Sequence, residues 1–214
     1  MTPYETDWEK PEFSRVPDLA ENMEYLLPGI DPVTVRKTLQ WAYRDFCSRS
    51  AALKTWRKMP IETGCVAYPV CPLVMGGIDC VTAVWRGGVP LPSGAWRAVG
   101  TMPPTVMLRT PFADVVRDSA DEPEFLWIEA VEVPDIGEEN APAPFLARYG
   151  QALVDGALAR LMLPQGRAWS NPEEGRMRAA DYERAVCEAR TRATVGAGDA
   201  ASQPASALDM SCLA

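Results

Sequence analysis

Proline constrains this 214-residue chain more than any other residue type, because each of its twenty prolines lacks a backbone donor and would break a helix anywhere beyond the first turn. Proline usage is well above the average of about 5%. The prolines concentrate outside the segments that have helical periodicity, so long, semi-extended connections are expected. Hydrophobic residues make up 47% of the chain, which is enough for a compact core.

Three segments have the apolar spacing of amphipathic helices. The first covers 31–50 and begins with Asp31 as its capping residue. The second covers 145–163, where alanine and glycine keep the helix slim. The third covers 172–194 and follows Asn171, which is a favourable N-cap before a proline. These helices are predicted to begin and end close to those residues.

Residues 53–133 have a different pattern, with short β-favouring runs separated by glycine-rich turns. The predicted strands lie within Thr55–Ile61, Val66–Pro72, Ile78–Arg86, Ala95–Val99, Val106–Arg109 and Phe125–Val133. A small antiparallel sheet or a β-sandwich fits this pattern. The last run is mostly apolar on both faces, which predicts a strand that is buried on both sides.

The two ends of the chain lack sustained periodicity. Residues 1–30 are rich in acidic side chains and are predicted to form an extended N-terminal arm. Residues 196–214 are mostly Ala, Ser, Gly and Pro and are predicted to form a flexible C-terminal tail. The intervening residues, 31–195, are expected to form the core.

Nothing in the sequence points to catalysis. The chain has no histidine, which removes the commonest general base and most zinc sites, and it has no glycine-rich phosphate loop. Six scattered cysteines match no metal-ligand spacing and are expected to be reduced thiols: Cys47, Cys65, Cys71, Cys80, Cys187 and Cys212. No enzymatic activity, cofactor or metal is therefore predicted. Glu129 and Glu132 are candidates for a carboxylate-only site on spacing alone, but a solvated face is the preferred interpretation.

Charge is unevenly placed along the chain. Residues 36–58 hold seven basic side chains and one acid, whereas residues 118–139 hold nine acids and no base. An ordinary polar surface is the preferred interpretation, although in a ring the same two bands could steer subunit docking. The net charge of −8 argues against a nucleic-acid-wrapping protein, yet an acidic wall could line a passage for DNA.

The sequence also predicts no association with a membrane. Its first residues lack the basic and apolar regions of a signal peptide. No run of about 18 apolar residues is present, so no transmembrane helix is expected.

One stretch reads Val-Arg-Lys-Thr-Leu-Gln-Trp-Ala-Tyr-Arg-Asp-Phe-Cys-Ser-Arg-Ser from Val35, followed by Trp56-Arg57. Another reads Ala-Arg-Tyr-Gly-Gln-Ala-Leu-Val-Asp-Gly-Ala-Leu-Ala-Arg-Leu-Met from Ala147, followed by Pro164 and Trp169-Ser-Asn-Pro-Glu. These two stretches resemble the head-to-tail adaptor (connector) proteins of tailed bacteriophages. The first, Val35–Arg57, is similar to the family's opening helix, Leu-x-x-Ala-x-x-(Asp/Glu)-Phe-Cys-x-(Arg/Lys)-(Ser/Thr), followed by a strand that contains Trp. The second, Ala147–Arg192, is similar to Tyr-x-x-Ala-(Ile/Leu)-x-x-Gly-Ala-Leu-x-Arg-Leu, a proline turn, (Trp/Tyr)-(Ser/Thr)-(Asn/Asp)-Pro and a final helix. Together they cover about a third of the chain. Each pattern alone is loosely defined, but the two patterns together, in this order, are fairly specific for the family.

The resemblance implies an α+β fold in which a helical bundle of three to four helices carries a β-rich insertion and extended N- and C-terminal arms. It also implies a structural protein of the virion neck, assembled in the host cytoplasm. Twelve copies would form a ring that binds the portal protein, closes the DNA-filled head and receives tail or nozzle proteins. Double-stranded DNA would pass through without sequence-specific binding. The alternatives are a head-completion or tail-tube protein of another neck layer, or a soluble carboxylate-dependent enzyme.

Residues 171–214 are expected to contact the portal, and the β-rich region is expected to face the tail. Tryptophan and arginine are common interface anchors, so exposed or terminal examples are the best candidates. The interface candidates are Trp8, Trp85, Trp96, Trp169, Tyr182, Arg176, Arg184, Arg190, Leu208, Met210 and Leu213.

Overall fold

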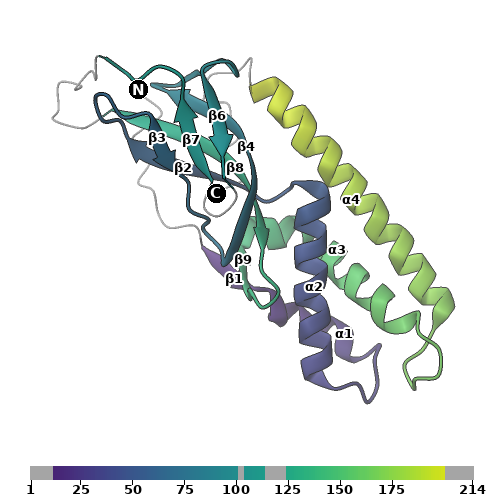
Figure 1. The fold of residues 1–214 in the computed structure, drawn as a ribbon. Helices are drawn as coiled ribbons and strands as arrows, with labels where there is room; N and C mark the ends of the chain where they lie inside the picture. Colours follow the sequence, from purple (N-terminus) through teal and green to yellow (C-terminus); the bar gives the residue numbers. More distant parts are fainter. Residues whose placement is uncertain (1–11, 101–103, 114–123, 201–214) are drawn as a thin grey trace. The chain divides into compact units, whose positions relative to one another are not determined.

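The computed structural model of the chain describes residues 12–100, 104–113 and 124–200 (Figure 1). These residues divide into two compact units. The helical unit lies within 12–52 and 134–194, and the β unit lies within 53–133. Each unit has its own buried core, and each is described by itself.

Three long helices build the helical unit: α2 (Pro32–Ser50), α3 (Ala143–Met162) and α4 (Pro172–Ala200). The α2 helix starts where Asp31 accepts a hydrogen bond from the Val33 amide, as the sequence predicts for a capped helix. It ends at Ala51, whose left-handed backbone lets its amide donate to a carbonyl of the last turn. The bounds of α2 and α3 lie within two residues of the predicted ones.

The segment before α2 folds into the core of the helical unit. Strand β1 (Phe13–Arg15) pairs antiparallel with β9 (Asn140–Pro142), and is followed by the 3₁₀ helix η1 (Val16–Ala20) and the single-turn helix α1 (Glu21–Glu24). Val16, Met23 and Leu27 are almost completely buried, and η1 packs against α2 and α3. The predicted extended arm is therefore wrong from residue 13 onward. Its apolar residues are too irregularly spaced to show a period, yet they fill space between helices.

Two antiparallel sheets form the β unit. The first has the order β2-β8-β4-β5 and the second has the order β3-β7-β6. The strands of the first sheet are β2 (Lys54–Pro60), β8 (Phe125–Pro134), β4 (Gly76–Arg86) and β5 (Val89–Pro90). Those of the second are β3 (Ala67–Pro69), β7 (Thr105–Leu108) and β6 (Trp96–Val99). All six predicted runs therefore contain a strand.

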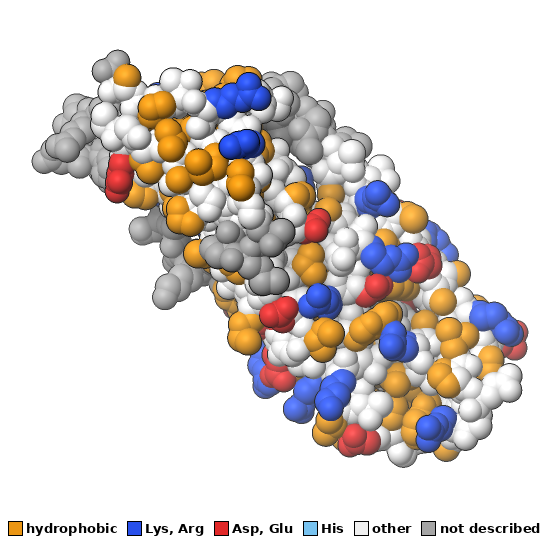
Figure 2. Space-filling view, viewed as in Figure 1, with side chains coloured by type: hydrophobic (Ala, Val, Ile, Leu, Met, Phe, Trp, Pro, Cys, Tyr) orange, Lys and Arg blue, Asp and Glu red, His pale blue; other side chains and the backbone are white. Residues whose placement is uncertain are grey.

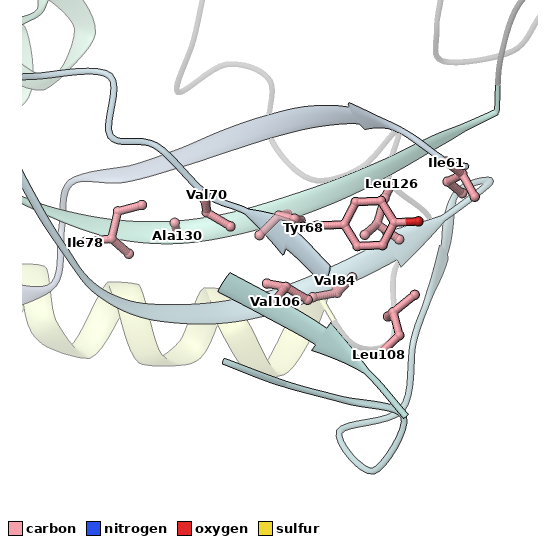
Figure 3. Close-up of a cluster of buried hydrophobic side chains, with 10 residues drawn as sticks. Ile61, Tyr68, Val70, Ile78, Val84, Val106, Leu108, Leu126 and Ala130 are labelled. Atoms are coloured by element: carbon pink, nitrogen blue, oxygen red, sulfur yellow. The ribbon is translucent and has the colours of Figure 1, made fainter. Parts of the chain in front are cut away.

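The core of the β unit lies between these two sheets, as Figure 3 shows. Tyr68 and Val106 enter it from the second sheet, and Val84 and Leu126 enter it from the first. Strand β8 is buried along nearly its whole length, with Leu126, Ile128 and Ala130 completely inaccessible. The prediction that this strand is buried on both sides is confirmed.

The predicted bundle of three to four helices with a β-rich insertion is wrong. The described residues form a mixed α+β structure with three long helices and one single helical turn, and its strands form three antiparallel sheets. One of these sheets, β1–β9, belongs to the helical unit, so strand structure is not confined to an insertion. Strands of three residues are too short to show a two-residue period, which is why the sequence pattern missed them.

The C-terminal boundary also differs from the prediction. Helix α4 continues to Ala200, so the predicted flexible tail from residue 196 is wrong for residues 196–200. Gly196 and Gly198 each lower helix propensity by about 1 kcal/mol relative to alanine, which is why the sequence predicts an earlier end. The rest of the predicted tail, 201–214, lies outside the described residues. Among the helices that the structure describes, none is long and apolar enough to cross a membrane.

Candidate functional site

A buried carboxylate on β8 has several bonded partners in the β unit. Glu132 has no exposed surface. One of its oxygens, Oε1, accepts hydrogen bonds from the Thr55 hydroxyl at 2.6 Å and the Leu73 amide at 2.9 Å. The other, Oε2, accepts from the Val74 amide at 3.2 Å. Arg57 completes the shell with an ion pair to the same carboxylate.

The register of β2 and β8 explains why these groups meet. Thr55 lies opposite Ala130 and Arg57 lies opposite Ile128 in the antiparallel pair. Side chains two residues apart share a face, so Thr55, Arg57 and Glu132 all lie on the core side of the sheet. The Nε atom of Arg57 also donates to the Cys71 carbonyl at 2.7 Å. The ion pair therefore fixes the backbone of residues 71–74, which follow β3.

The second candidate carboxylate, Glu129, is also buried, with 6% of its surface exposed. It accepts a hydrogen bond from the Thr82 hydroxyl and lies 3.7 Å from the Lys54 ammonium. The preferred interpretation of Glu129 and Glu132 as a solvated face is therefore wrong. Residues three apart in a strand point to opposite faces, so the two carboxylates cannot act on one substrate as a pair. Both oxygens of Glu132 already accept hydrogen bonds, which makes this group an anchor for the loop.

The two charge bands are partly paired with one another among the described residues. Three ion pairs connect them: Arg44–Asp135 at 3.4 Å, Lys54–Glu129 at 3.7 Å and Arg57–Glu132. The antiparallel pairing of β2 with β8 brings two of these pairs together. Neither band as a whole is therefore available to attract a second copy of the chain. Within residues 12–100, 104–113 and 124–200, no cluster of three acids or cysteines is placed to hold a metal ion.

Tyr182 on α4 joins the three long helices of the helical unit. Its hydroxyl donates to a carboxylate oxygen of Asp45 on α2 at 2.7 Å, and its ring centroid lies 6.0 Å from that of Phe46. On α3, a Cβ atom added to Gly156 would lie 2.7 Å from the Tyr182 ring, so only glycine allows this approach. Burial, followed by the hydrogen bond to Asp45, raises the pKa of the Tyr182 phenol well above its usual value.

An exposed ion pair lies beside this joint. The Arg49 guanidinium on α2 pairs with both Asp45 and Glu183, and so connects α2 to α4 a second time. Hydrogen bonding to Arg49 lowers the pKa of Glu183 below its usual value. Tyr182 and Arg49 together fix the position of α4 in the helical unit.

The structure separates the predicted interface residues into three groups. Trp85 and Tyr182 are buried inside their units, and Trp96 is partly buried against the core of the β unit, so these three do not form an open surface. Trp169 is half-buried in the α3–α4 connection, and the exposed side chains on α4 are Arg176, Arg184 and Arg190. Trp8, Leu208, Met210 and Leu213 lie outside the described residues.

Sequence reasoning missed a surface that we call the outer face, which is the solvent side of the β3-β7-β6 sheet. Met107 on β7 lies opposite Ala67 on β3 and opposite Arg97 on β6, so these three side chains share the outer face. Val99 and Arg109 each follow one of these residues by two positions and therefore lie on the same face. Figure 2 shows hydrophobic side chains gathered on the visible side of the β unit, with two groups of basic side chains among them. Arg97 and Arg109 form no ion pair with any residue that the structure describes.

One signal in the sequence could have revealed this face. The run from Ala67 to Val74 is apolar at almost every position, yet its odd-numbered residues are exposed and most of its even-numbered residues are buried. Such a run is usually covered on both sides.

Comparisons of the chain with known protein families and with curated proteins find no match. Function is therefore inferred from the chain's own residues and their contacts.

Proposed function

We propose that this protein is a head-to-tail adaptor of a tailed bacteriophage. In this role it is a structural subunit of the virion neck, and twelve copies form a ring beneath the portal protein. The ring closes the DNA-filled head, provides the docking platform for tail or nozzle proteins and surrounds the path of the double-stranded DNA. No sequence-specific contact with DNA is required.

The observation that carries this proposal is the contact between the two adaptor-like stretches. They are separated by almost the whole β unit in sequence, yet they pack together in the helical unit. Phe46 of the first stretch lies 5.0 Å from Tyr149 and 6.0 Å from Tyr182 of the second, measured between ring centroids. Asp45, beside Phe46, accepts the hydrogen bond from Tyr182. The helical parts of both stretches therefore form one joint, whereas Trp56 and Arg57 of the first stretch lie on β2 in the β unit.

The exposed part of α4 supports a role in docking. Arg176, Arg184 and Arg190 are exposed along this helix, while Tyr182 and Val186 are buried against the helical unit. The buried residues hold the helix in place. Among these three arginines, Arg184 pairs locally with Asp181, and Arg176 and Arg190 have no ion pair with a residue that the structure describes. We place the portal contact on α4 and the residues that follow it, and the tail contact on the β unit.

A phage that lacks this chain tests the proposal. It should accumulate heads that package DNA but lose it or fail to bind tails. Adding the purified protein to those heads should restore tail attachment, whereas an unrelated acidic protein should not. Normal yields of tailed, infectious particles without the chain would overturn the proposal. A ring found at another level of the neck would assign the protein to head completion or to the tail tube.

A further inference from the structure

Strand β6 forms one edge of the β3-β7-β6 sheet and pairs on one side only, with β7. Ala95 accepts a hydrogen bond from the Arg109 amide at 2.9 Å, so the backbone groups of alternate residues from Ala95 onward face β7. Those of Trp96 and Ala98 therefore face the other way, where no residue that the structure describes bonds to them. Ala98 is exposed and Val99 beside it is 46% exposed, so solvent reaches this edge.

Proline closes the other edges of the two sheets in the β unit. The edge strands β2, β3 and β5 contain one proline each: Pro60, Pro69 and Pro90. In all three, the residue after the proline donates its amide to the neighbouring strand or to the residue directly before it, at 2.8 or 2.9 Å. Consecutive residues face opposite sides, so each proline faces outward and offers no donor to an added strand. Among the edge strands that the structure describes in this unit, β6 is the one without a proline.

The side chains along this edge indicate the chemistry of a partner. Arg97 and Val99 lie on the outer face, whereas Trp96 packs against the core of the β unit from the opposite face. Arg97 is exposed, Arg109 is exposed on the same face, and none of the three strands of this sheet contains an acidic residue. A strand added beside β6 should therefore place a carboxylate next to Arg97 and apolar side chains on its other face.

We propose that β6 binds an extended segment of another protein as an added strand, and that this segment alternates acidic and apolar residues. The outward backbone groups of Trp96 and Ala98 supply the hydrogen bonds, and Arg97 selects for the acids. A second copy of β6 is a poorer occupant, because an antiparallel pair centred on Ala98 would make the two Arg97 side chains diagonal neighbours on one face. The site lies on one chain and requires neither a ring nor the portal protein, so its test is independent of that of the adaptor proposal.

Hydrogen exchange of the backbone amides, measured by nuclear magnetic resonance on the full chain, tests the proposal directly. The Ala98 amide should exchange roughly tenfold faster than the Arg97 amide or more, because the Arg97 amide faces β7. The probe is a synthetic peptide that alternates glutamate and valine. Saturating amounts of it should slow exchange at Ala98 by about tenfold or more and leave Arg97 unchanged. An Ala98 amide that is already protected in the free chain, or that the peptide does not protect, would overturn the proposal.

Calorimetric titration of two β6 variants with the same peptide gives a second measurement. Ala98→Pro removes an outward donor that β7 does not use, so it should abolish binding and leave thermal unfolding close to that of wild type. Arg97→Glu should weaken binding roughly tenfold and strengthen binding of a lysine–valine peptide by a similar factor. The control Arg36→Glu, which reverses an exposed charge on α2, should change neither.

Two results of these measurements would contradict the proposal. The first is binding of the glutamate–valine peptide that is unchanged in Arg97→Glu. The second is protection of Ala98 that rises with protein concentration when no peptide is present, because it would identify a second copy of the chain as the occupant.

Discussion

At the scale of single residues, Glu132 illustrates how a charge can be buried at low cost when every oxygen is satisfied. Its carboxylate accepts from two backbone amides and one hydroxyl and pairs with Arg57, whose side chain is only 14% exposed. Replacing Glu132 with Gln removes the charge and leaves the buried guanidinium uncompensated. We expect this variant to lower the free energy of unfolding by about 3–5 kcal/mol.

The matched control is Asp135→Asn, which breaks the exposed pair with Arg44. An exposed ion pair contributes roughly 0–1 kcal/mol, so this variant should be close to wild type. Chemical denaturation of the three proteins measures both values. Equal, small losses in the two variants would show that Glu132 does not anchor residues 71–74.

Tyr182 makes stability depend on pH in the alkaline range. Its pKa is raised above the usual tyrosine value of 10.0, mainly by burial and then by the bond to Asp45. The folded protein therefore keeps this proton where the unfolded chain releases it. The contribution is fully present below about pH 10 and is lost as the pH rises further, by up to about 1.4 kcal/mol per pH unit.

The variant Tyr182→Phe isolates this contribution, because it keeps the ring and removes the ionisable hydroxyl. Its free energy of unfolding should be lower than that of wild type at neutral pH, by roughly 1.5–3 kcal/mol for a hydrogen bond to a charged group. Above about pH 10 the gap between the two proteins should narrow. Denaturation curves at several alkaline pH values measure the gap, and a constant gap would contradict the assignment.

At the scale of elements, glycine allows α3 and α4 to approach closely. Gly156→Ala should destabilise the protein despite the helix propensity of alanine, because the new Cβ would lie 2.7 Å from the Tyr182 ring. Overpacking of this kind typically costs about 1–3 kcal/mol. Gly150→Ala on the same helix is the control, since its Cβ would meet a Leu19 side-chain carbon at an ordinary 3.4 Å.

The control should leave stability unchanged or raise it by up to about 1 kcal/mol, which is the propensity difference between the two residues. Thermal unfolding of the two variants gives the comparison. A Gly156→Ala protein at least as stable as the Gly150→Ala protein would show that the contact with Tyr182 is not tight.

Only some of the helices and strands could be predicted from the sequence. Helices α2 and α3 and the strands of the β unit other than β5 follow from periodicity, capping and turn residues, because these are local signals. Strands β1 and β9 and the helical turn α1 do not, because they form only against neighbours that are distant in sequence. The burial of Glu129 and Glu132 has the same cause, since their partners come from β2, β4 and the loop after β3.

At the scale of the whole molecule, ion pairs within the chain limit how many charged side chains remain available to partner proteins. The basic and acidic bands, which were potential contacts between subunits, are joined by three ion pairs in one chain. Within the part of the chain that the structure describes, the exposed arginines of α4 and the outer face of the β unit are two surfaces that remain open to a partner. We therefore expect contacts to the portal to weaken with added salt, because exposed charges are screened.

The mass of the assembled protein tests the central proposal most directly. Purified chain should be mixed with the portal protein of the same phage, and the complex should be weighed by native mass spectrometry and imaged by electron microscopy. The adaptor proposal predicts twelve copies in a ring on one end of the portal. Monomers or dimers that do not bind the portal at any tested salt concentration would contradict it.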